Sequence, residues 1–244
     1  MKLLIDADIV LFKAAAAVEK EVEFEPDVWV LWTDVSEAIQ AFTDSLANLL
    51  ELADTYSYLL AFSDTVNFRK QIYPEYKANR TQRKPMAFKT IRERVFEEYA
   101  HKIVTLPGLE ADDVLGITAT ASPGETMIWS EDKDLRQIPG LHLTAEGQKV
   151  IYPDEADRWF YTQVLIGDTA DNYKGCPGVG PVKAERCLEH AQPHEMWDCV
   201  VDQYIKAHLT EEDALVQARL ARILRSDDWN SETKEVKLWQ PITA

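Results

Sequence analysis

Short apolar runs that each end in an aspartate are the feature that most constrains the fold of this chain. The three clearest runs cover residues 2–5, 58–62 and 126–130. The acids that follow them are Asp6, Asp64, Asp132 and Asp134. Short apolar runs bounded by polar residues are typical of buried strands. Since the carboxyl ends of parallel strands meet at one edge of an open sheet, where ligands bind, we expect these acids to converge there.

Helical patterns separate these runs along the chain. Helices are expected at residues 8–20, 34–50, 87–100 and 110–120. Further short strands are expected at residues 28–32 and 103–106, together with a hairpin at 141–144 and 149–152. Strands that alternate with helices predict an α/β fold in which a mostly parallel, Rossmann-like sheet is flanked by helices.

The pattern changes near Pro153, where the strand signals stop. The helices expected beyond this point cover residues 154–166, 181–190, 195–207 and 211–225. We therefore expect an α/β domain at residues 1–153 and a helical subdomain at residues 154–244 packed against it.

The composition indicates one compact unit without a membrane span. The chain has 244 residues, 46% of them apolar and 28% charged. No segment approaches the roughly 18 consecutive apolar residues that a span needs, and Asp6 interrupts the first apolar run, which excludes a signal peptide. Three cysteines do not make a disulfide framework, which favours a reducing compartment. We expect a cytoplasmic protein that does not contact a membrane.

Charge is distributed unevenly along the chain. The formal net charge is −16, which by itself argues against a polyanionic partner. Residues 69–94 reverse this sign, with nine cations against two acids and therefore a net charge of +7. Cations interleaved with aromatic residues fit phosphate contacts and base stacking on a nucleic acid, although a solvated face is the simpler reading of a charge run. The residues of this window expected to bind DNA are Arg69, Tyr76, Arg83 and Lys84.

Further acids occur in close groups. They are Glu110, Asp112, Asp113, Asp168 and Asp171. Carboxylates that converge raise each other's pKa unless cations keep them ionised. Oxygen ligands without paired His or Cys suit Mg²⁺ or Mn²⁺, and two such ions can clamp both oxygens of a phosphodiester displacement. Any single pair is more simply explained as a solvated loop or a helix cap, so the hypothesis rests on the whole set.

Two further motifs contain residues of types that bind ligands. The turn that contains Gly178 and Gly180 leads into a helix with Lys183, and backbone N–H groups at such a helix start can hold a phosphate. An ordinary glycine turn between helices is the alternative. A zinc site is not expected, because the spacing of the residues that resemble one matches no common site and Pro193 interrupts it. Those residues are Cys187, His190, His194 and Cys199.

The order of these motifs is distinctive. Leu-Ile-Asp-Ala-Asp, Phe-Ser-Asp, Tyr-Lys-Ala-Asn-Arg, Gly-Leu-Glu-Ala-Asp-Asp-Val-Leu-Gly, Glu-Asp-Lys-Asp-Leu and Gly-Asp-Thr-Ala-Asp-Asn follow one another from residue 4 to residue 172. With the glycine turn, this series resembles the flap-endonuclease/5′→3′ exonuclease family, and most closely the replication exonucleases of short-tailed phages. The resemblance covers nearly the whole chain.

The resemblance implies a PIN-like α/β domain, a helix–three-turn–helix subdomain that grips duplex DNA, and two Mg²⁺ ions for which Mn²⁺ can substitute. It assigns the first ion to Asp6, Asp64, Glu110 and Asp112, the second to Asp132, Asp134 and Asp168, and outer positions to Asp113 and Asp171. Residues 68–90 would form an arch from which Lys77 and Arg80 hold the scissile phosphate and Tyr76 stacks on a terminal base. A K⁺ ion at the glycine turn is also implied.

This sequence departs from the family pattern at two places. Asp8 stands where many relatives have glycine, so its role as a ligand does not follow from the resemblance. Tyr173-Lys174 stands where relatives have Ile-Pro, which changes the loop before the glycine turn.

We therefore interpret the chain as a Mg²⁺-dependent 5′→3′ nuclease that acts on duplex DNA, flaps and RNA primers and leaves 5′-phosphate products. A PIN-type ribonuclease would share the acids without needing the glycine turn, and a non-catalytic DNA-binding module would keep them as vestiges. Replication proteins are candidate partners, and a monomer is the default oligomeric state.

Overall fold

A six-stranded sheet forms the centre of the molecule. The computed structural model describes residues 1–241. The strand order is β5-β4-β1-β6-β7-β8, and every neighbouring pair is parallel except β7 and β8. The strands are β1 (Lys2–Asp6), β4 (Tyr58–Ala61), β5 (Ile103–Val104), β6 (Thr126–Trp129), β7 (Gly140–Thr144) and β8 (Gly147–Ile151). The predicted α/β fold with a mostly parallel sheet is confirmed.

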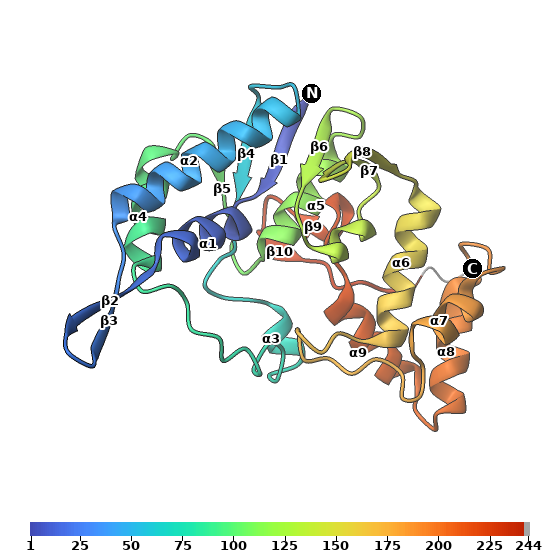
Figure 1. Cartoon of the computed structure of the whole chain (residues 1–244). Helices are drawn as coiled ribbons and strands as arrows, with labels where there is room; N and C mark the ends of the chain where they lie inside the picture. Colours follow the sequence, from blue (N-terminus) through green and yellow to red (C-terminus); the bar gives the residue numbers. More distant parts are fainter. Residues whose placement is uncertain (242–244) are drawn as a thin grey trace.

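Helices cover both faces of this sheet (Figure 1). Three of them, α1 (Ala7–Val18), α2 (Val35–Leu52) and α4 (Phe88–Glu98), lie on one face, and α5 (Ala111–Ala121) lies on the other. Alternate side chains of a strand point to opposite faces, so Leu3 and Ile5 pack with the first group while Leu4 packs against α5. Their complete burial explains why residues 3–5 are continuously apolar.

A second core lies among the C-terminal helices. They are α6 (Pro153–Ile166), α7 (Pro181–Leu188), α8 (Met196–Lys206) and α9 (Glu211–Ala221). The last one ends four residues before the expected boundary, because the chain becomes extended at Arg222. From there it returns to the sheet, where Ile223 and Leu224 pack against α5. No helix within residues 1–241 combines the length and the apolar character needed to cross a bilayer.

Two short strand pairs lie outside the central sheet. The strand expected at residues 28–32 is β3 (Val28–Trp32), and it pairs with β2 (Lys20–Glu25) in a separate hairpin. The expectation that strands stop at residue 153 is wrong, because β9 (Trp229–Asn230) pairs with β10 (Glu235–Val236). These strands have only two residues each, too few for a period-two pattern to be recognised in the sequence.

The basic segment contains little regular structure. A single helical turn, α3 (Arg69–Ile72), is followed by turns and irregular backbone until α4 begins. This segment links β4 to α4 along the chain, and in Figure 1 it passes beside the helical region at α3 before it returns to α4.

Candidate active site

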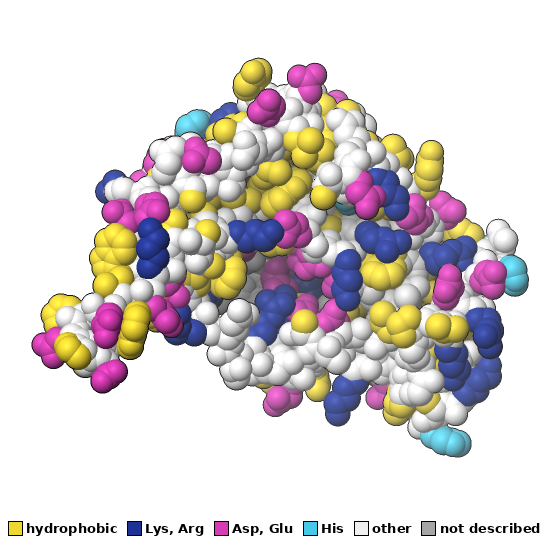
Figure 2. Space-filling model, viewed as in Figure 1, with side chains coloured by type: hydrophobic (Ala, Val, Ile, Leu, Met, Phe, Trp, Pro, Cys, Tyr) yellow, Lys and Arg dark blue, Asp and Glu magenta, His cyan; other side chains and the backbone are white. Residues whose placement is uncertain are grey.

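An open cavity of about 1220 Å³ lies beyond the carboxyl ends of β1, β4 and β6. The acids that line it are Asp6, Asp8, Asp64, Glu93, Glu110, Asp112 and Asp132. The cations that line it are Lys77, Arg80, Lys84, Lys89 and Arg92. Figure 2 shows acidic side chains in the depth of this hollow and basic side chains around it. The cavity therefore combines two charge types that the linear sequence keeps largely apart.

Asp6 occupies the junction between β1 and α1. Its carboxylate accepts a hydrogen bond from the backbone N–H of Ile9 at 3.4 Å, which caps α1, and a second from the hydroxyl of Ser130 at 2.8 Å. Only 3% of Asp6 is exposed. Burial, together with the nearby charges of Asp8 and Asp132, raises the pKa of Asp6 to about 7.

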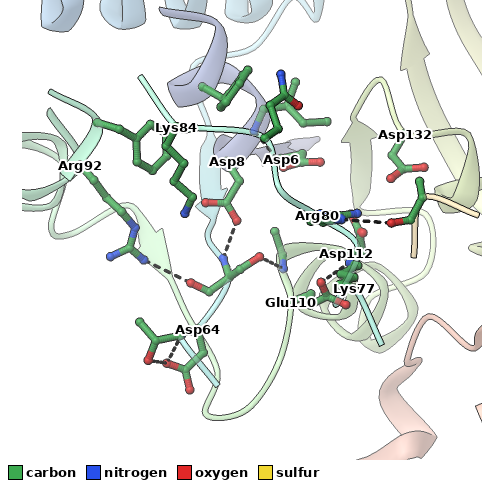
Figure 3. Close-up of a pocket in the computed structure, with 18 of the residues that line it drawn as sticks. Asp6, Asp8, Asp64, Lys77, Arg80, Lys84, Arg92, Glu110, Asp112 and Asp132 are labelled. Atoms are coloured by element: carbon green, nitrogen blue, oxygen red, sulfur yellow. Dashed lines mark hydrogen bonds and ion pairs between the residues drawn. The ribbon is translucent and has the colours of Figure 1, made fainter. Parts of the chain in front are cut away.

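Asp112 lies in the first turn of α5 and faces the cavity (Figure 3). Burial is the main cause that raises the pKa of Asp112 well above its ordinary value, and the charges of Asp6, Asp132 and Glu110 add to it. These acids come from three separate parts of the chain. The fold brings them to the same cavity, where their charges disfavour one another.

Asp134 belongs to a neighbouring group of acids. It lies in the 3₁₀ turn Lys133–Gln137, and burial, followed by the charges of Asp132 and Asp168, raises its pKa to about 7. Its buried Oδ1 has no hydrogen-bond partner within residues 1–241. Asp168 accepts hydrogen bonds from the backbone N–H groups of Ala170, at 2.6 Å, and Asp171, at 3.1 Å.

Lys77 joins the basic segment to the acids. Its backbone is left-handed, with φ +57°, a conformation that is uncommon for a residue with a side chain and that often marks functional sites. Its ammonium contacts the Glu110 carboxylate and lies 3.3 Å from Asp171. Burial alone would raise the pKa of Glu110, but the charges of Lys77 and Arg69 outweigh it and lower this pKa to about 2.

Arg80 completes this ion-pair network. Its guanidinium lies 2.5 Å from Asp171, which also receives a hydrogen bond from the Tyr76 hydroxyl at 2.9 Å. Exposed Arg80 and half-buried Lys77 therefore contact the same Asp171 carboxylate.

Asp64 lines the cavity but does not join the other acids. Its carboxylate accepts hydrogen bonds from the backbone N–H groups of Gly108 at 2.7 Å and Thr65 at 2.6 Å. The first of these is the main cause that lowers the pKa of Asp64. Figure 3 shows Asp64 apart from Asp6 and Asp112, next to its own loop. Asp6, Asp64, Asp112 and Asp132 thus line one cavity, as expected, with Asp64 at its side and bonded to its own loop.

The structure contradicts two expectations: that Arg69 contacts DNA, and that Asp113 takes an outer position around an ion. Both side chains are buried, and they form a two-pronged ion pair with both N–O distances at 2.7 Å. Asp113 also accepts from the backbone N–H of Leu224 at 3.1 Å, and Arg69 donates to the carbonyl of Leu220 at 3.0 Å. This pair joins α3, α5 and the end of α9, so its role is in the fold.

Tyr76 is likewise not available for stacking on a base. Only 2% of it is exposed, and its ring packs in the core of the helical region. Its hydroxyl donates to the carboxylates of Glu110 and Asp171. The expectation of a stacking role is wrong because the ring is buried, and only its hydroxyl reaches the acids.

The other residues expected to bind DNA are exposed. Lys84 lines the cavity, whereas Arg83 pairs with Glu19 outside it. Gly178, Gly180 and Lys183 lie at the start of α7, where Gly180 is the N-cap residue. This turn belongs to the helical region and does not line the cavity.

Comparison with known proteins identifies the family. A family model described as the 5′-3′ exonuclease N-terminal, resolvase-like domain matches residues 1–158. The exonuclease of Escherichia phage T7 is 31% identical, over 98% of this chain and 93% of its own length. The chain belongs to the 5′→3′ exonuclease family.

Solved structures agree with this family at the level of the fold. The T5 D15 protein co-crystallised with metal ions superposes with a TM-score of 0.65 at 14% identity, over 90% of this chain and 88% of its own. A complex of the T5 D15 flap endonuclease with DNA and metal ions gives a TM-score of 0.62 at 16% identity, with the same coverage. The predicted family and PIN-like fold are confirmed, and the chain is homologous to 5′→3′ exonuclease enzymes.

The acids of this exonuclease-family cavity suit a hard divalent cation in their chemistry. All the donors are oxygens, and the pKa values of Asp6, Asp8 and Asp112 are raised. In the neighbouring group of acids the pKa of Asp134 is also raised, and its buried Oδ1 has no hydrogen-bond partner within residues 1–241. Within residues 1–241, however, no three Asp, Glu, His or Cys side chains are arranged to hold an ion as they stand. Lys77 contacts Glu110 and Asp171, so binding at those two acids requires this ammonium to move away.

Sequence reasoning missed the two glycines that shape the loop carrying Asp168 and Asp171. Gly167 has φ +69° and Gly175 has φ +63°, and a Cβ built on either would lie within 2.3–2.7 Å of the backbone at the other position. The backbone segments at the two ends of the loop therefore lie in close contact. An antiparallel bridge between Asp168 and Tyr173 also joins them. Gly167 directly precedes the Asp168–Asp171 pair, and that adjacency was the available signal.

Two serines and one arginine were also missed. The Ser130 hydroxyl donates to Asp6, and the Ser63 hydroxyl accepts from the backbone N–H of Ala111 at 2.9 Å. Arg92 lines the cavity, and its guanidinium lies over the Phe96 ring, 4.1 Å from the ring centre. Each of these residues adjoins or falls within a segment that the sequence already singled out.

Proposed function

We propose that the chain hydrolyses phosphodiester bonds from the 5′ ends of duplex DNA, and that flaps and RNA primers are also substrates. The observation that carries this proposal is the meeting of repelling acids with Lys77 and Arg80 in one cavity. Acids that lack partners suit cations, and side-chain cations beside them that can exchange a carboxylate partner for a phosphate suit a nucleic acid.

The residues of the cavity then have distinct roles. Asp6, Asp112 and Asp132 would hold Mg²⁺, for which Mn²⁺ can substitute, together with Asp134 from the neighbouring group of acids. Bound in pairs, such ions supply charge stabilisation and water activation for in-line displacement at phosphorus. Lys77 and Arg80 would exchange their carboxylate partners for the scissile phosphate, which delivers two positive charges to the oxygens where negative charge develops.

Glu110 and Asp171 would hold these two cations before substrate arrives. Asp171 contacts both, and Glu110 contacts Lys77. This pairing neutralises part of the acidic cavity in the free enzyme. A phosphate that replaces the carboxylates would release Glu110 and Asp171 to serve ions, as inner or outer ligands.

The helical region, residues 154–241, would bind the duplex away from the cut. Backbone N–H groups at the start of α7, next to Gly178 and Gly180, suit one phosphate, and Lys183 adds a charge beside them. A K⁺ ion at this turn stays a prediction from the family resemblance.

Cleavage assays on the purified chain test the proposal. The substrates are a 5′-labelled DNA duplex, a 5′ flap and a single-stranded RNA, each with Mg²⁺ and then with chelator. We expect cleavage of the two DNA substrates only with the metal, and 5′-phosphate products. Preferential cleavage of the RNA would favour a PIN-type ribonuclease, and binding without any cleavage would favour a non-catalytic module.

Asp134→Ala tests the ion-binding role separately. This variant should lose cleavage and keep near-normal affinity for the duplex, because the DNA-contacting residues are unchanged. Cleavage at the wild-type rate would remove Asp134 from the proposed ligand set.

A further inference from the structure

The hairpin formed by β2 and β3 projects from the body of the molecule, at the lower left of Figure 1. It connects α1 to α2 and forms a sheet of its own, so it adds no strand to the central sheet. All but one of the residues in its two strands are exposed. A two-stranded hairpin with so little support is marginally stable alone, so the fold does not explain its composition.

One face of this hairpin is apolar. Val22 lies opposite Val30, and Trp32 lies opposite Lys20 on the same face. Phe24, which lies at an irregularity of the strand between Glu23 and Glu25, is 73% exposed, and Trp32 is 48% exposed. Trp29, on the opposite face, is 61% exposed. Exposed aromatic residues in a cluster of this kind mark interaction surfaces.

The charge of the hairpin limits what can cover it. Residues 20–32 contain four acids and one lysine, a net charge of −3. Negative charge disfavours DNA, because phosphates would be repelled without cations to receive them. It also disfavours a second copy of the same hairpin, because Glu21, Glu23 and Glu25 would face their own counterparts. Acids on edge strands are a recognised protection against such self-pairing.

The root of the hairpin is joined to the basic segment. Glu19 precedes β2, and its carboxylate forms an ion pair with Arg83 and accepts from the backbone N–H of Met86 at 2.6 Å. Lys84, which follows Arg83 in the chain, lines the active-site cavity. A protein held on the hairpin would therefore lie beside the cavity without covering the α7 turn.

We propose that the β2–β3 hairpin is a docking element for another protein, whose surface has an apolar groove with a basic rim. The groove would receive Phe24, Trp32 and their valine neighbours, and the basic rim would pair with the three glutamates. Complementary charge adds association rate and selectivity to the apolar contact.

A photo-crosslinking experiment tests this proposal on the full chain. One variant carries benzoylphenylalanine at position 24, and a matched control carries it at Tyr56, an aromatic residue that is 93% exposed elsewhere on the surface. Both are irradiated in an extract of the cells that naturally make the chain. A protein crosslinked at position 24 and not at position 56 is identified by mass spectrometry and purified.

Calorimetry on that purified protein then decides the chemistry. We expect Phe24→Ser/Trp32→Ser to weaken its binding at least tenfold and to leave nuclease activity unchanged. Glu21→Gln/Glu23→Gln/Glu25→Gln should also weaken binding and should reduce its dependence on salt. The proposal is overturned if no protein is captured selectively at position 24, if DNA or a second copy of the chain is captured there, or if either set of variants binds as tightly as the wild type.

Discussion

Asp112 and Asp113 are consecutive residues of α5 with opposite surroundings. Asp113 is fully buried, and its carboxylate receives the fork of Arg69 and two backbone N–H groups. Asp112 faces the cavity, where its strongest charged neighbours are other acids. Successive residues of a helix are about 100° apart around its axis, so one carboxylate points to the core and the next to the site.

The carboxylates of Asp113 and Asp112 therefore have two different roles. A charge that has complete partners holds parts of the fold together, as Asp113 does for α3, α5 and the end of α9. A charge left among like charges lowers stability, and the fold tolerates it where an ion or substrate supplies the missing cation. The same residue type therefore predicts different losses at the two positions.

Asp112→Asn should give the largest effect, on activity. Loss of an ion-holding oxygen removes several kcal/mol of transition-state stabilisation, so turnover should fall by about 10³-fold or more. The metal-free protein should be at least as stable as the wild type, because a repelling charge is removed. Steady-state cleavage and urea unfolding measure the two quantities. Asp54→Asn, at an exposed aspartate, is the control.

Asp113→Ala should give the opposite result. It leaves the Arg69 guanidinium buried without its partner, which costs about 3–5 kcal/mol of unfolding free energy. Urea unfolding measures the loss. Replacing both partners, as in Arg69→Met/Asp113→Leu, should recover part of it, since no charge is then left unpaired. A single variant as stable as the wild type would break the comparison with Asp112.

Lys77→Ala should lower turnover by about 10²–10³-fold, the usual cost of one charged contact to a transition state. Freed of this ammonium, Glu110 and Asp171 should bind Mg²⁺ at least as well, so the loss should lie in turnover and not in metal affinity. Single-turnover kinetics and a Mg²⁺ titration separate these. The control is Lys70→Ala, at an exposed lysine of α3 outside the cavity, which should keep wild-type turnover and Mg²⁺ affinity.

The pH dependence of stability should show the smallest effect. Burial, aided by Asp132 and Asp168, raises the pKa of Asp134 from 3.8 to about 7. Below pH 4 both the folded and the unfolded chain hold this proton. As pH rises toward 7 the unfolded chain releases it first, so the metal-free protein should lose stability over this interval.

Melting temperatures between pH 4 and pH 8 in chelator measure this loss. Asp134→Asn should have a flatter profile than the wild type. The remaining slope comes from Asp6, Asp8 and Asp112, whose pKa values burial also raises. Added Mg²⁺ should restore wild-type stability near pH 7 and should act less on the variant. Parallel profiles for the two proteins would contradict the assignment.

The sequence was sufficient to place most of the elements and the acids at their ends. The apolar runs before Asp6 and Asp132 predicted β1 and β6, because a strand buried on both faces needs continuous apolar residues. It could not predict that Asp64 turns to the N–H groups of its own loop. A hydrogen bond from a nearby backbone N–H group can hold a carboxylate away from the other acids. The spacing of residues in the sequence does not predict whether such a bond forms.

Residue types and their order thus determined by themselves the α/β class, the family and the set of acids from which a site could be built. Tertiary structure decided which of those charges are satisfied. It buried Arg69 against Asp113, took Tyr76 out of reach of a substrate and left Asp112 among acids. The reason is physical: a strand or helix reflects neighbours along the chain, whereas the state of a buried charge depends on groups that only folding brings within a few ångströms.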